Sequence, residues 1–274
     1  MDQGTYNSIE HVCCLMDGDR TYAIIKNNDY SKINEYAYYS GALSLERLMA
    51  MTFKKLKIRY LSINLVGRRN CLKRPDAIKN VVNLVPKFFS KKWLNYFIEN
   101  KIRVKFLGDI DLFTSLSENP DLIKSEIKKV EDATSNFSDY YLIAMAAYEP
   151  AYEYMKLFGT QKFNKLEEMK KAYYGFDIPD VNLIIRSWRP KVTGCLPIMI
   201  SDYSDIYFFT SPFQYFKLGH YKSILEDYSK RTESSSVKYG EEDIKNIKNY
   251  AKEIGNGNVF ILGEKKGNVW LPFK

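Results

Sequence analysis

The sequence predicts an α/β protein whose central sheet is mostly parallel and flanked by helices. Short apolar runs recur along the 274-residue chain, and longer amphipathic segments separate them. This alternation is typical of parallel strands joined by helical crossovers, which cover both faces of the sheet. The chain is also long enough to bury a sizeable core. In such sheets, ligands bind at the carboxyl ends of the strands.

The expected strands are the six short apolar runs His11–Met16, Tyr60–Val66, Ile102–Leu107, Tyr140–Ala147, Asn182–Arg186 and Asp205–Phe208. The expected helices are the longer amphipathic segments Lys32–Leu56, Asp76–Asn100, Asn119–Ala133, Tyr148–Lys171, Phe213–Lys230 and Glu241–Ile254. Pro86 and Pro150 indicate that the second and fourth of these helices are kinked or begin late, because proline cannot donate the hydrogen bond of a helix interior.

The end of the chain predicts a β-hairpin. The stretch GNVFILGEKKGNVWLPF reads as two short strands joined by Glu264-Lys265-Lys266-Gly267. The chain shows neither an internal repeat nor a long linker. The simplest interpretation is one domain over residues 1–274, in which residues 257–274 form a C-terminal hairpin appendage.

Composition narrows the class of protein. Hydrophobic residues make up 45% of the chain and charged residues 27%, as in ordinary globular proteins. No apolar run reaches the roughly 18 residues of a membrane span. The N-terminus lacks the basic and apolar regions of a signal peptide, so a cytoplasmic location is expected. The four cysteines form no C-x-x-C pair, which argues against a zinc site.

The net charge of +8 is compatible with a nucleic acid, a membrane surface or a polyanionic substrate. Nucleic-acid binding proteins usually carry a concentrated basic stripe, whereas these lysines are spread over several amphipathic segments. We therefore expect no nucleic-acid partner. The apolar and aromatic content leaves a lipid-like substrate and a peripheral contact with a membrane open.

Charged residues follow the first expected strand, in the sequence Asp17-Gly18-Asp19-Arg20-Thr21. Gly18 lets the backbone approach a ligand, Arg20 can pair with phosphate oxygens, and Asp17 can hold Mg²⁺ against them. A solvated D-G turn explains the same residues equally simply. Taken alone, this stretch leaves both interpretations open.

A second cluster follows the strand Asn182–Arg186. Arg186, Arg189, Lys191 and Thr193 come directly after buried residues, and Asp205 begins the next strand. Two strand ends that carry basic groups and a carboxylate suit two diphosphates and one metal ion.

These residues resemble the motifs of the cis-prenyltransferases, the undecaprenyl diphosphate synthase family. The family pattern H-x-x-x-x-M-D-G-N-x-R-x-A matches at His11, Met16, Asp17, Gly18 and Ala23, and D-L-x-I-R-T-x-G-x-x-R-x-S matches at Leu183, Ile185 and Arg186. Arg74-Pro75, Leu107-Gly108-Asp109 and Asp205-Ile206-Tyr207-Phe208 stand for the family's R-P, I-G-D and E-L-Y-F. The resemblance covers residues 11 to about 231, and its order and spacing are more specific than any single motif.

The resemblance implies an enzyme that condenses an allylic isoprenoid diphosphate with a second isoprenoid diphosphate. The resemblance further implies that Asp17 is catalytic and holds Mg²⁺ at the allylic diphosphate, and that Asp205 is a second metal ligand. It implies diphosphate binding by Gly18, Asp19, Arg20, Thr21, Arg186, Lys191 and Thr193. It also implies a homodimer, and an apolar tunnel walled by the segments Tyr36–Leu56 and Val81–Phe97.

The departures from the family pattern concern elongation. Asp19 stands where the family has asparagine, Thr21 where it has arginine, and Tyr38 where it has histidine. Cys71 aligns with the asparagine of S-x-E-N-W-x-R-P, and the N-Y-G-G-R stretch, here Ala147-Tyr148-Glu149-Pro150-Ala151, loses its arginine. A thiol and a carboxylate lack the paired donor and acceptor of an amide, so we expect a short-chain product.

Three interpretations remain within the family: a regular cis-prenyl diphosphate synthase, an irregular enzyme that joins two allylic units head-to-middle, and a non-catalytic partner subunit of a cis-prenyltransferase complex. Retention of Asp17 argues against the partner subunit. A basic nucleic-acid-binding protein is the alternative from a different class. The sequence leaves open the substrates, the product length, the homo- or hetero-oligomeric state, and whether Cys71 replaces an asparagine in function.

Overall fold

The computed structural model describes residues 9–26, 32–88, 91–188, 195–229, 240–249, 263–266 and 269–272. The contacts divide the chain into two compact units, of which the larger is Ile9–Leu218. The described residues beyond Leu218 belong to the second unit. The expectation of one domain over the whole chain stays a prediction.

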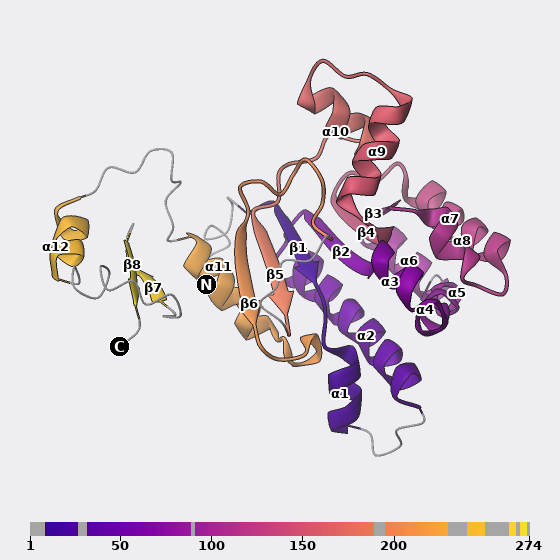
Figure 1. Ribbon diagram of the computed structural model, residues 1–274, viewed down its shortest axis with the longest axis horizontal. Coiled ribbons are helices and arrows are strands. Elements are labelled where there is room, and N and C mark those ends of the chain that lie inside the picture. The colour runs from indigo at the N-terminus through magenta and orange to yellow at the C-terminus, as the bar shows by residue number, and fades with distance from the viewer. Residues whose placement is uncertain are drawn as a thin grey trace. The chain divides into compact units, whose positions relative to one another are not determined.

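A six-stranded sheet forms the centre of the larger unit (Figure 1). Its order is β3-β4-β2-β1-β5-β6, and every neighbouring pair is parallel. The strands are β1 (His11–Leu15), β2 (Tyr60–Gly67), β3 (Ile102–Leu107), β4 (Tyr140–Tyr148), β5 (Leu183–Ser187) and β6 (Asp205–Phe209). All six predicted strands are confirmed, with ends that differ by no more than one residue.

The order of the strands creates a switch point between β1 and β5. The chain leaves β1 toward β2 on one side, and it leaves β5 toward β6 on the other side. Crossovers that depart in opposite directions open a crevice at the carboxyl ends of the two central strands. Asp17 follows β1, and Arg186 is the residue before the last one of β5. Both predicted clusters therefore lie at this crevice.

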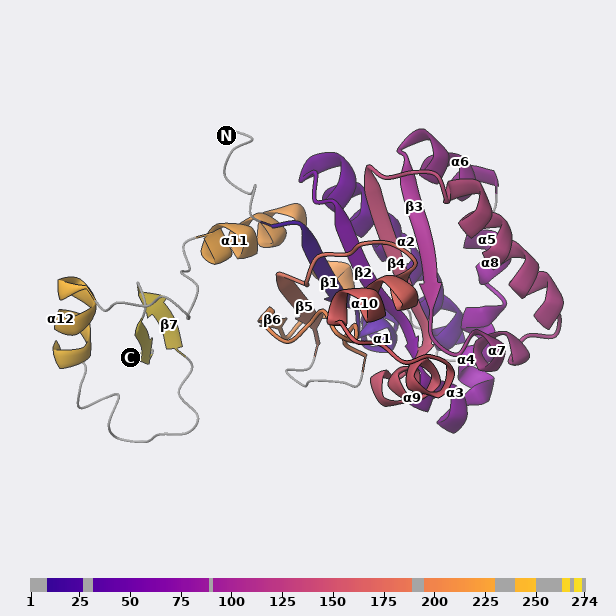
Figure 2. The ribbon, with the colours of Figure 1, turned by 90° about the horizontal axis from the view of Figure 1, so that it is seen from above.

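Helices of the larger unit cover its sheet, and Figure 2 shows them from above. In Figure 1, α1 and α2 lie at the opposite end of the view from α9 and α10. The described helices are α1 (Asp19–Lys26), α2 (Ile33–Met49), the π-helix η2 (Ala50–Lys55), α3 (Arg68–Lys73), α4 (Pro75–Val82), α5 (Val85–Phe88), α6 (Lys91–Glu99), α7 (Ile110–Ser115), α8 (Pro120–Thr134), α9 (Pro150–Thr160), α10 (Leu166–Tyr174), the 3₁₀-helix η3 (Phe213–Tyr215), α11 (Leu218–Ser229) and α12 (Glu241–Asn249).

Two long predicted helices are interrupted. The segment predicted as Asp76–Asn100 forms α4, α5 and α6, and Pro86 lies in the first turn of α5. Tyr148 ends β4, and α9 begins at Pro150, because proline is tolerated in the first turn and not in a helix interior. The short helices α1, α3 and α7 were not predicted, because their six to eight residues give too few turns for a clear apolar periodicity.

The second unit contains the predicted hairpin. Strand β7 (Gly263–Lys266) pairs with β8 (Val269–Pro272) in antiparallel register. The predicted turn was placed too early, since residues 264–266 belong to β7. Among the described residues, no helix has both the length and the apolar character that a membrane span requires.

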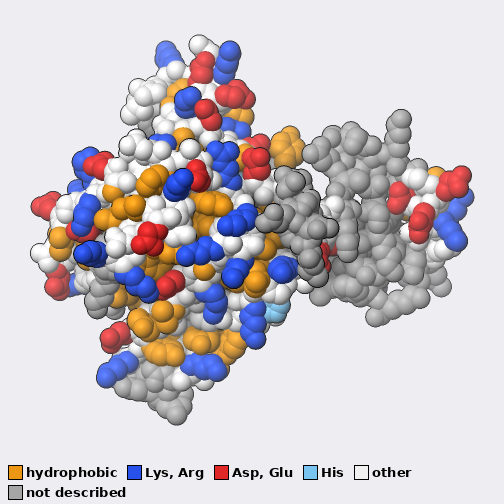
Figure 3. Space-filling model, turned by 180° about the vertical axis from the view of Figure 1, so that it is seen from behind, with side chains coloured by type: hydrophobic (Ala, Val, Ile, Leu, Met, Phe, Trp, Pro, Cys, Tyr) orange, Lys and Arg blue, Asp and Glu red, His pale blue; other side chains and the backbone are white. Residues whose placement is uncertain are grey.

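Lys and Arg side chains do not gather into one stripe on the face shown in Figure 3. Blue basic side chains are interleaved there with orange hydrophobic and red acidic ones. On this face the distribution resembles the dispersed lysines of the sequence, and the absence of a nucleic-acid partner stays a prediction.

Candidate active site

Asp17 and Arg186 meet at the carboxyl edge of the sheet, although 169 positions separate them in the sequence. Arg186 Nη2 donates to Asp17 Oδ2 over 2.6 Å, and the Arg186 side chain is only 7% exposed. Asp17 is held from its other side as well, because its backbone N–H donates to Ser187 Oγ over 2.8 Å. The Asp17 carboxylate is 44% exposed, so it is fixed in place and still open to a ligand.

Gly18 is required at the start of α1. Its φ is +97°, and a Cβ at this position would lie 2.7 Å from the Cα of Pro212. Only glycine fits both conditions without strain. The backbone then turns directly into α1, whose first N–H groups carry the positive end of the helix dipole. The strand end, the glycine and the helix together form a backbone geometry suited to an anion.

A charged cavity of about 610 Å³ opens at this point. All five residues of the sequence cluster, 17–21, line it, and Arg74 and Trp188 line it too. Ile24, Ile33 and Asn34 from α1 and α2 complete its described walls. The expectation that Gly18, Asp19, Arg20 and Thr21 share one site agrees with this arrangement.

An apolar cavity of about 440 Å³ adjoins the charged one. Asp17, Asp19, Arg20 and Arg74 line both cavities. The apolar cavity lies between the sheet and the helices α2, α4 and α6, and both segments predicted as tunnel walls contribute to it. The aromatic side chains on its wall are Tyr38, Trp93, Phe97, Phe106, Phe113 and Phe213.

Asp19 differs from Asp17 in its surroundings. Gln214 Nε2 donates to Asp19 Oδ1, and Gln214 Nε2 also lies 3.4 Å from Ser40 Oγ. Burial raises the pKa of Asp19 to about 6, while the Gln214 hydrogen bond acts in the opposite direction and Asp17 raises it further. Asp19 therefore takes up a proton at a higher pH than an exposed aspartate does, although it is mostly ionised at pH 7.

Arg74 is the main site residue that the sequence analysis did not select. It caps α3, lines both cavities, and donates from Nη2 to Asn70 Oδ1 over 2.7 Å. Its match to the R-P motif was the available signal. Tyr38 lies close enough to Arg20 and Arg74 for both to lower its pKa, although burial has the larger effect and the pKa is raised.

Cys71 does not occupy the cavity. The residue is buried at 1% exposure, lines neither cavity, and has a thiol pKa raised to about 11 by burial. Asn70, one position earlier, lines the apolar cavity instead. The family pattern has its asparagine amide at position 71, and in this chain an asparagine amide is present one residue earlier, at Asn70.

Asp205 corrects one expectation. It is the first residue of β6 and pairs with Leu183 at the amino end of β5, whereas Asp17 follows the carboxyl end of β1. Val12 also pairs with Leu183, so Asp17 lies about 16 Å further along the strand direction. In a single chain the two carboxylates cannot hold one metal ion. Arg189, Lys191 and Thr193 lie outside the described residues.

The donor set fits a magnesium ion held mainly by its substrate. Among the residues that the structure describes, no three His, Cys, Asp or Glu side chains form a metal cluster. Mg²⁺ commonly binds through one or two carboxylates together with substrate phosphates and water. The half-exposed Asp17 carboxylate at the charged cavity supplies one such ligand, and Asp19 lines the same cavity.

A family model described as "Putative undecaprenyl diphosphate synthase" matches residues 15–236 of this chain. An isoprenyl transferase of Rickettsia bellii is 24% identical over 229 residues, which cover 82% of this chain and 96% of the relative. The tritrans,polycis-undecaprenyl-diphosphate synthase (geranylgeranyl-diphosphate specific) of Thermoplasma volcanium is 23% identical over 215 residues, covering 74% of this chain and 79% of that protein.

Solved structures share the fold. The lavandulyl diphosphate synthase of Lavandula x intermedia, in complex with dimethylallyl diphosphate, aligns with a TM-score of 0.68 at 15% identity and covers 82% of this chain and 97% of its own. A probable undecaprenyl diphosphate synthase of Campylobacter jejuni aligns with a TM-score of 0.63 at 20% identity and covers 84% and 100%. At these identities the likeness shows the fold alone.

Proposed function

Because this chain belongs to the undecaprenyl diphosphate synthase family and is a prenyl diphosphate transferase, we propose that it condenses an allylic isoprenoid diphosphate with a second isoprenoid diphosphate to a short-chain product. The observation that carries the proposal is the pair of adjoining cavities, one charged and one apolar, which share Asp17, Asp19, Arg20 and Arg74. An isoprenoid diphosphate has the same two halves, an anionic head and an apolar tail.

Each half of the site has a chemical task in this proposal. Breaking the allylic C–O bond leaves positive charge on carbon and negative charge on the departing diphosphate. Arg20, Arg74 and the N–H groups of α1 stabilise the departing diphosphate, since they carry positive charge before the reaction begins. The apolar cavity keeps water from the allylic carbon. Mg²⁺ bound between Asp17 and the phosphate oxygens would neutralise further charge on the leaving group.

The short product rests on the size of the apolar cavity. Its volume of about 440 Å³ is in the lower part of the range for small-molecule pockets. Trp93 and Phe97 of α6 occupy its wall with large aromatic rings. We expect products of no more than about four isoprene units, a length suited to a pocket of this class.

The edge strand β6 supports a homodimer. The sheet ends at β6, and Ile206 and Phe208 on this strand are 40% and 43% exposed. The exposed apolar side chains of this edge strand offer hydrophobic area to a second copy. Sedimentation velocity of the wild type and of Phe208→Lys tests this proposal: we expect a dimer that the lysine weakens, and a monomeric wild type would contradict it.

One product assay tests the proposed reaction and separates the two routes. The protein and Mg²⁺ are incubated with labelled dimethylallyl diphosphate alone, and then with isopentenyl diphosphate together with C5, C10, C15 or C20 allylic donors. Product from dimethylallyl diphosphate alone would indicate head-to-middle condensation. Product only in the presence of isopentenyl diphosphate would indicate the regular cis reaction.

Two results would contradict parts of the proposal. Chains of ten or more units would show that neither the cavity volume nor the changes at Asp19 and Cys71 limit elongation. No product under any pairing, with diphosphate still bound, would overturn the enzymatic proposal and favour a non-catalytic partner subunit. Asp17→Asn serves as the control for product formed without the site.

A further inference from the structure

Arg68 forms a charged anchor outside both cavities. It is the first residue of α3, and its Nε lies 3.2 Å from Asp109 Oδ2. Its Nη1 lies 3.7 Å from Glu149 Oε2, and its guanidinium stacks over the Tyr152 ring at 4.0 Å. These partners follow β3 and β4, so one arginine joins the carboxyl ends of three strands, including its own β2.

The anchor rests on rigid backbone. Asp109 Oδ1 accepts from the N–H of Leu112 and caps α7, which fixes the carboxylate in place. The preceding Gly108 has a φ of +117°, and a Cβ there would lie 2.0 Å from the carbonyl oxygen of Ala146. The strand β3 therefore ends in close backbone contact with β4. Arg68, Asp109 and Glu149 line neither cavity.

The other end of α3 reaches the site. Arg74 caps this six-residue helix and is bonded to Asn70 one turn earlier. Asn70 lines the apolar cavity and Arg74 lines both cavities. A helix that is held at its first residue and is followed by a cation at its C-cap transmits the position of one to the other, since six residues span only about 9 Å.

We propose that Arg68 is a positioning residue: its ion pairs with Asp109 and Glu149 hold α3 so that Arg74 faces the diphosphate of the substrate. The inference rests on the proposed function only for the identity of the ligand as a diphosphate. Arg68 itself does not touch the ligand. The planar guanidinium suits this task, because it meets two carboxylates and an aromatic face at once, which the ammonium of lysine does not.

Binding of inorganic pyrophosphate in the presence of Mg²⁺, measured by titration calorimetry, tests the inference without turnover. Arg68→Met keeps the aliphatic stem and removes the charge, and we expect it to raise the Kd about fivefold. Glu149→Gln removes the more exposed partner and should raise the Kd about twofold, with little risk to folding. Arg68→Lys should restore only part of the affinity.

A double-mutant cycle decides whether Arg68 acts through Arg74. Arg74→Met should raise the Kd about tenfold or more, as expected for a charge-assisted phosphate contact. If Arg68 acts only by placing Arg74, then adding Arg68→Met to Arg74→Met should change the Kd no further. Independent, multiplying effects of the two substitutions would overturn the inference, because they would assign Arg68 a role apart from Arg74.

Arg59→Met is the matched control. Arg59 also stacks on aromatic rings and donates to a backbone carbonyl, but it precedes β2 at the opposite end of the strand. Its loss should leave the Kd unchanged. A wild type that binds pyrophosphate and is unaffected by Arg68→Met would overturn this inference alone, whereas a wild type that binds no pyrophosphate would overturn the proposed function as well.

Discussion

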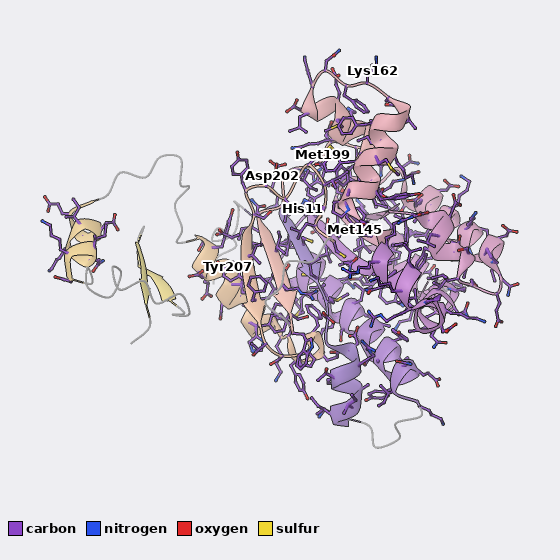
Figure 4. All side chains as sticks on the ribbon, viewed as in Figure 1. His11, Met145, Lys162, Met199, Asp202 and Tyr207 are labelled. Atoms are coloured by element: carbon purple, nitrogen blue, oxygen red, sulfur yellow. The ribbon has the colours of Figure 1, made fainter. Side chains whose placement is uncertain are left out.

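The carboxyl ends of the strands of the central sheet, here called the carboxyl edge, differ in structure from their amino ends, here called the amino edge. At the carboxyl edge, Asp17, Arg20 and Arg74 line cavities that a ligand can enter. At the amino edge, buried aromatic rings pack against one another. Figure 4 labels His11, Met199 and Asp202 on this side of the molecule, away from α1. The same six parallel strands therefore present charge at one end and packed rings at the other.

The amino edge carries a row of residues in register across four strands. His11 pairs with Tyr60, Tyr60 with Tyr141, and Tyr141 with Arg103. The rings of Tyr60 and Tyr141 stack with centroids 4.5 Å apart, and Tyr141 contacts Phe176 at 4.7 Å. These contacts stabilise the sheet through burial and ring stacking.

Hydrogen bonding shows the same difference. The neutral ring of His11 donates from Nδ1 to the Pro179 carbonyl over 3.0 Å and accepts at Nε2 from the Ser62 hydroxyl over 2.8 Å. Both of its nitrogens are thus satisfied inside the protein. Asp17, by contrast, keeps nearly half of its carboxylate exposed. The stacked aromatic row and the exposed carboxylate of the candidate site therefore lie at opposite ends of one sheet.

The largest expected effect is on activity at the carboxyl edge. Asp17→Asn preserves an acceptor for the buried Arg186, whereas alanine would remove that acceptor. We expect kcat/KM to fall by about a thousandfold, the upper range for loss of a group that stabilises transition-state charge. Steady-state kinetics measure this loss, and urea unfolding should show nearly wild-type stability. Wild-type turnover in this variant would contradict the assignment.

The next effect is on stability at the amino edge. Tyr141→Ala removes a ring that is 6% exposed, stacked on Tyr60 and in contact with Phe176, so we expect the free energy of unfolding to fall by about 3 kcal/mol. Tyr38→Ala, at the cavity wall, should cost less than about 1 kcal/mol and lower activity instead. Urea unfolding and kinetics of both variants check this; equal losses of stability would remove the distinction between the edges.

A pH effect of intermediate size should come from His11. Burial lowers its pKa to about 4, well below the ordinary value of 6.5. As the pH falls, His11 therefore binds a proton in the unfolded chain before it does so in the folded state. The free energy of unfolding falls by about 2 kcal/mol between pH 7 and pH 5 for this reason. The contribution of His11 to stability is fully present above about pH 6.5.

The measurement for His11 must be a difference between two proteins, because the raised pKa of Asp19 acts with the opposite sign. A folded state that binds a proton at Asp19 before the unfolded state does gains stability as the pH falls. Subtracting the unfolding free energies of His11→Gln from those of the wild type at each pH isolates the histidine. A difference that does not change with pH would show that His11 does not contribute as proposed.

The smallest effect should separate the two substrates. Arg186→Lys keeps a positive charge beside Asp17 but loses the planar fork. We expect the KM of the acceptor diphosphate to rise about tenfold, and more than that of the allylic donor. Initial rates with each substrate varied in turn test this. Equal increases for both would mean that Arg186, placed beside Asp17, serves the two diphosphates alike.

The sequence by itself determined the six strands and the charged cluster at the end of β1. Their apolar runs are short and continuous, because strands covered on both faces need no polar alternation. The same feature predicted that the residues after His11–Leu15 and after Leu183–Ser187 would stand at a ligand-binding edge. The local sequence pattern was sufficient there, because the residues at which an apolar run begins and ends can be read from the run itself.

The tertiary structure alone decided which of these residues meet. Strand order placed β5 beside β1 and so brought Arg186 to Asp17, while it put Asp205 at the opposite edge. It also turned Arg74 toward the cavities and Cys71 into the core, although Cys71 lies on α3 and Arg74 is the C-cap of the same helix. Pairing between distant strands depends on burial summed over the whole sheet, and no local propensity encodes that sum.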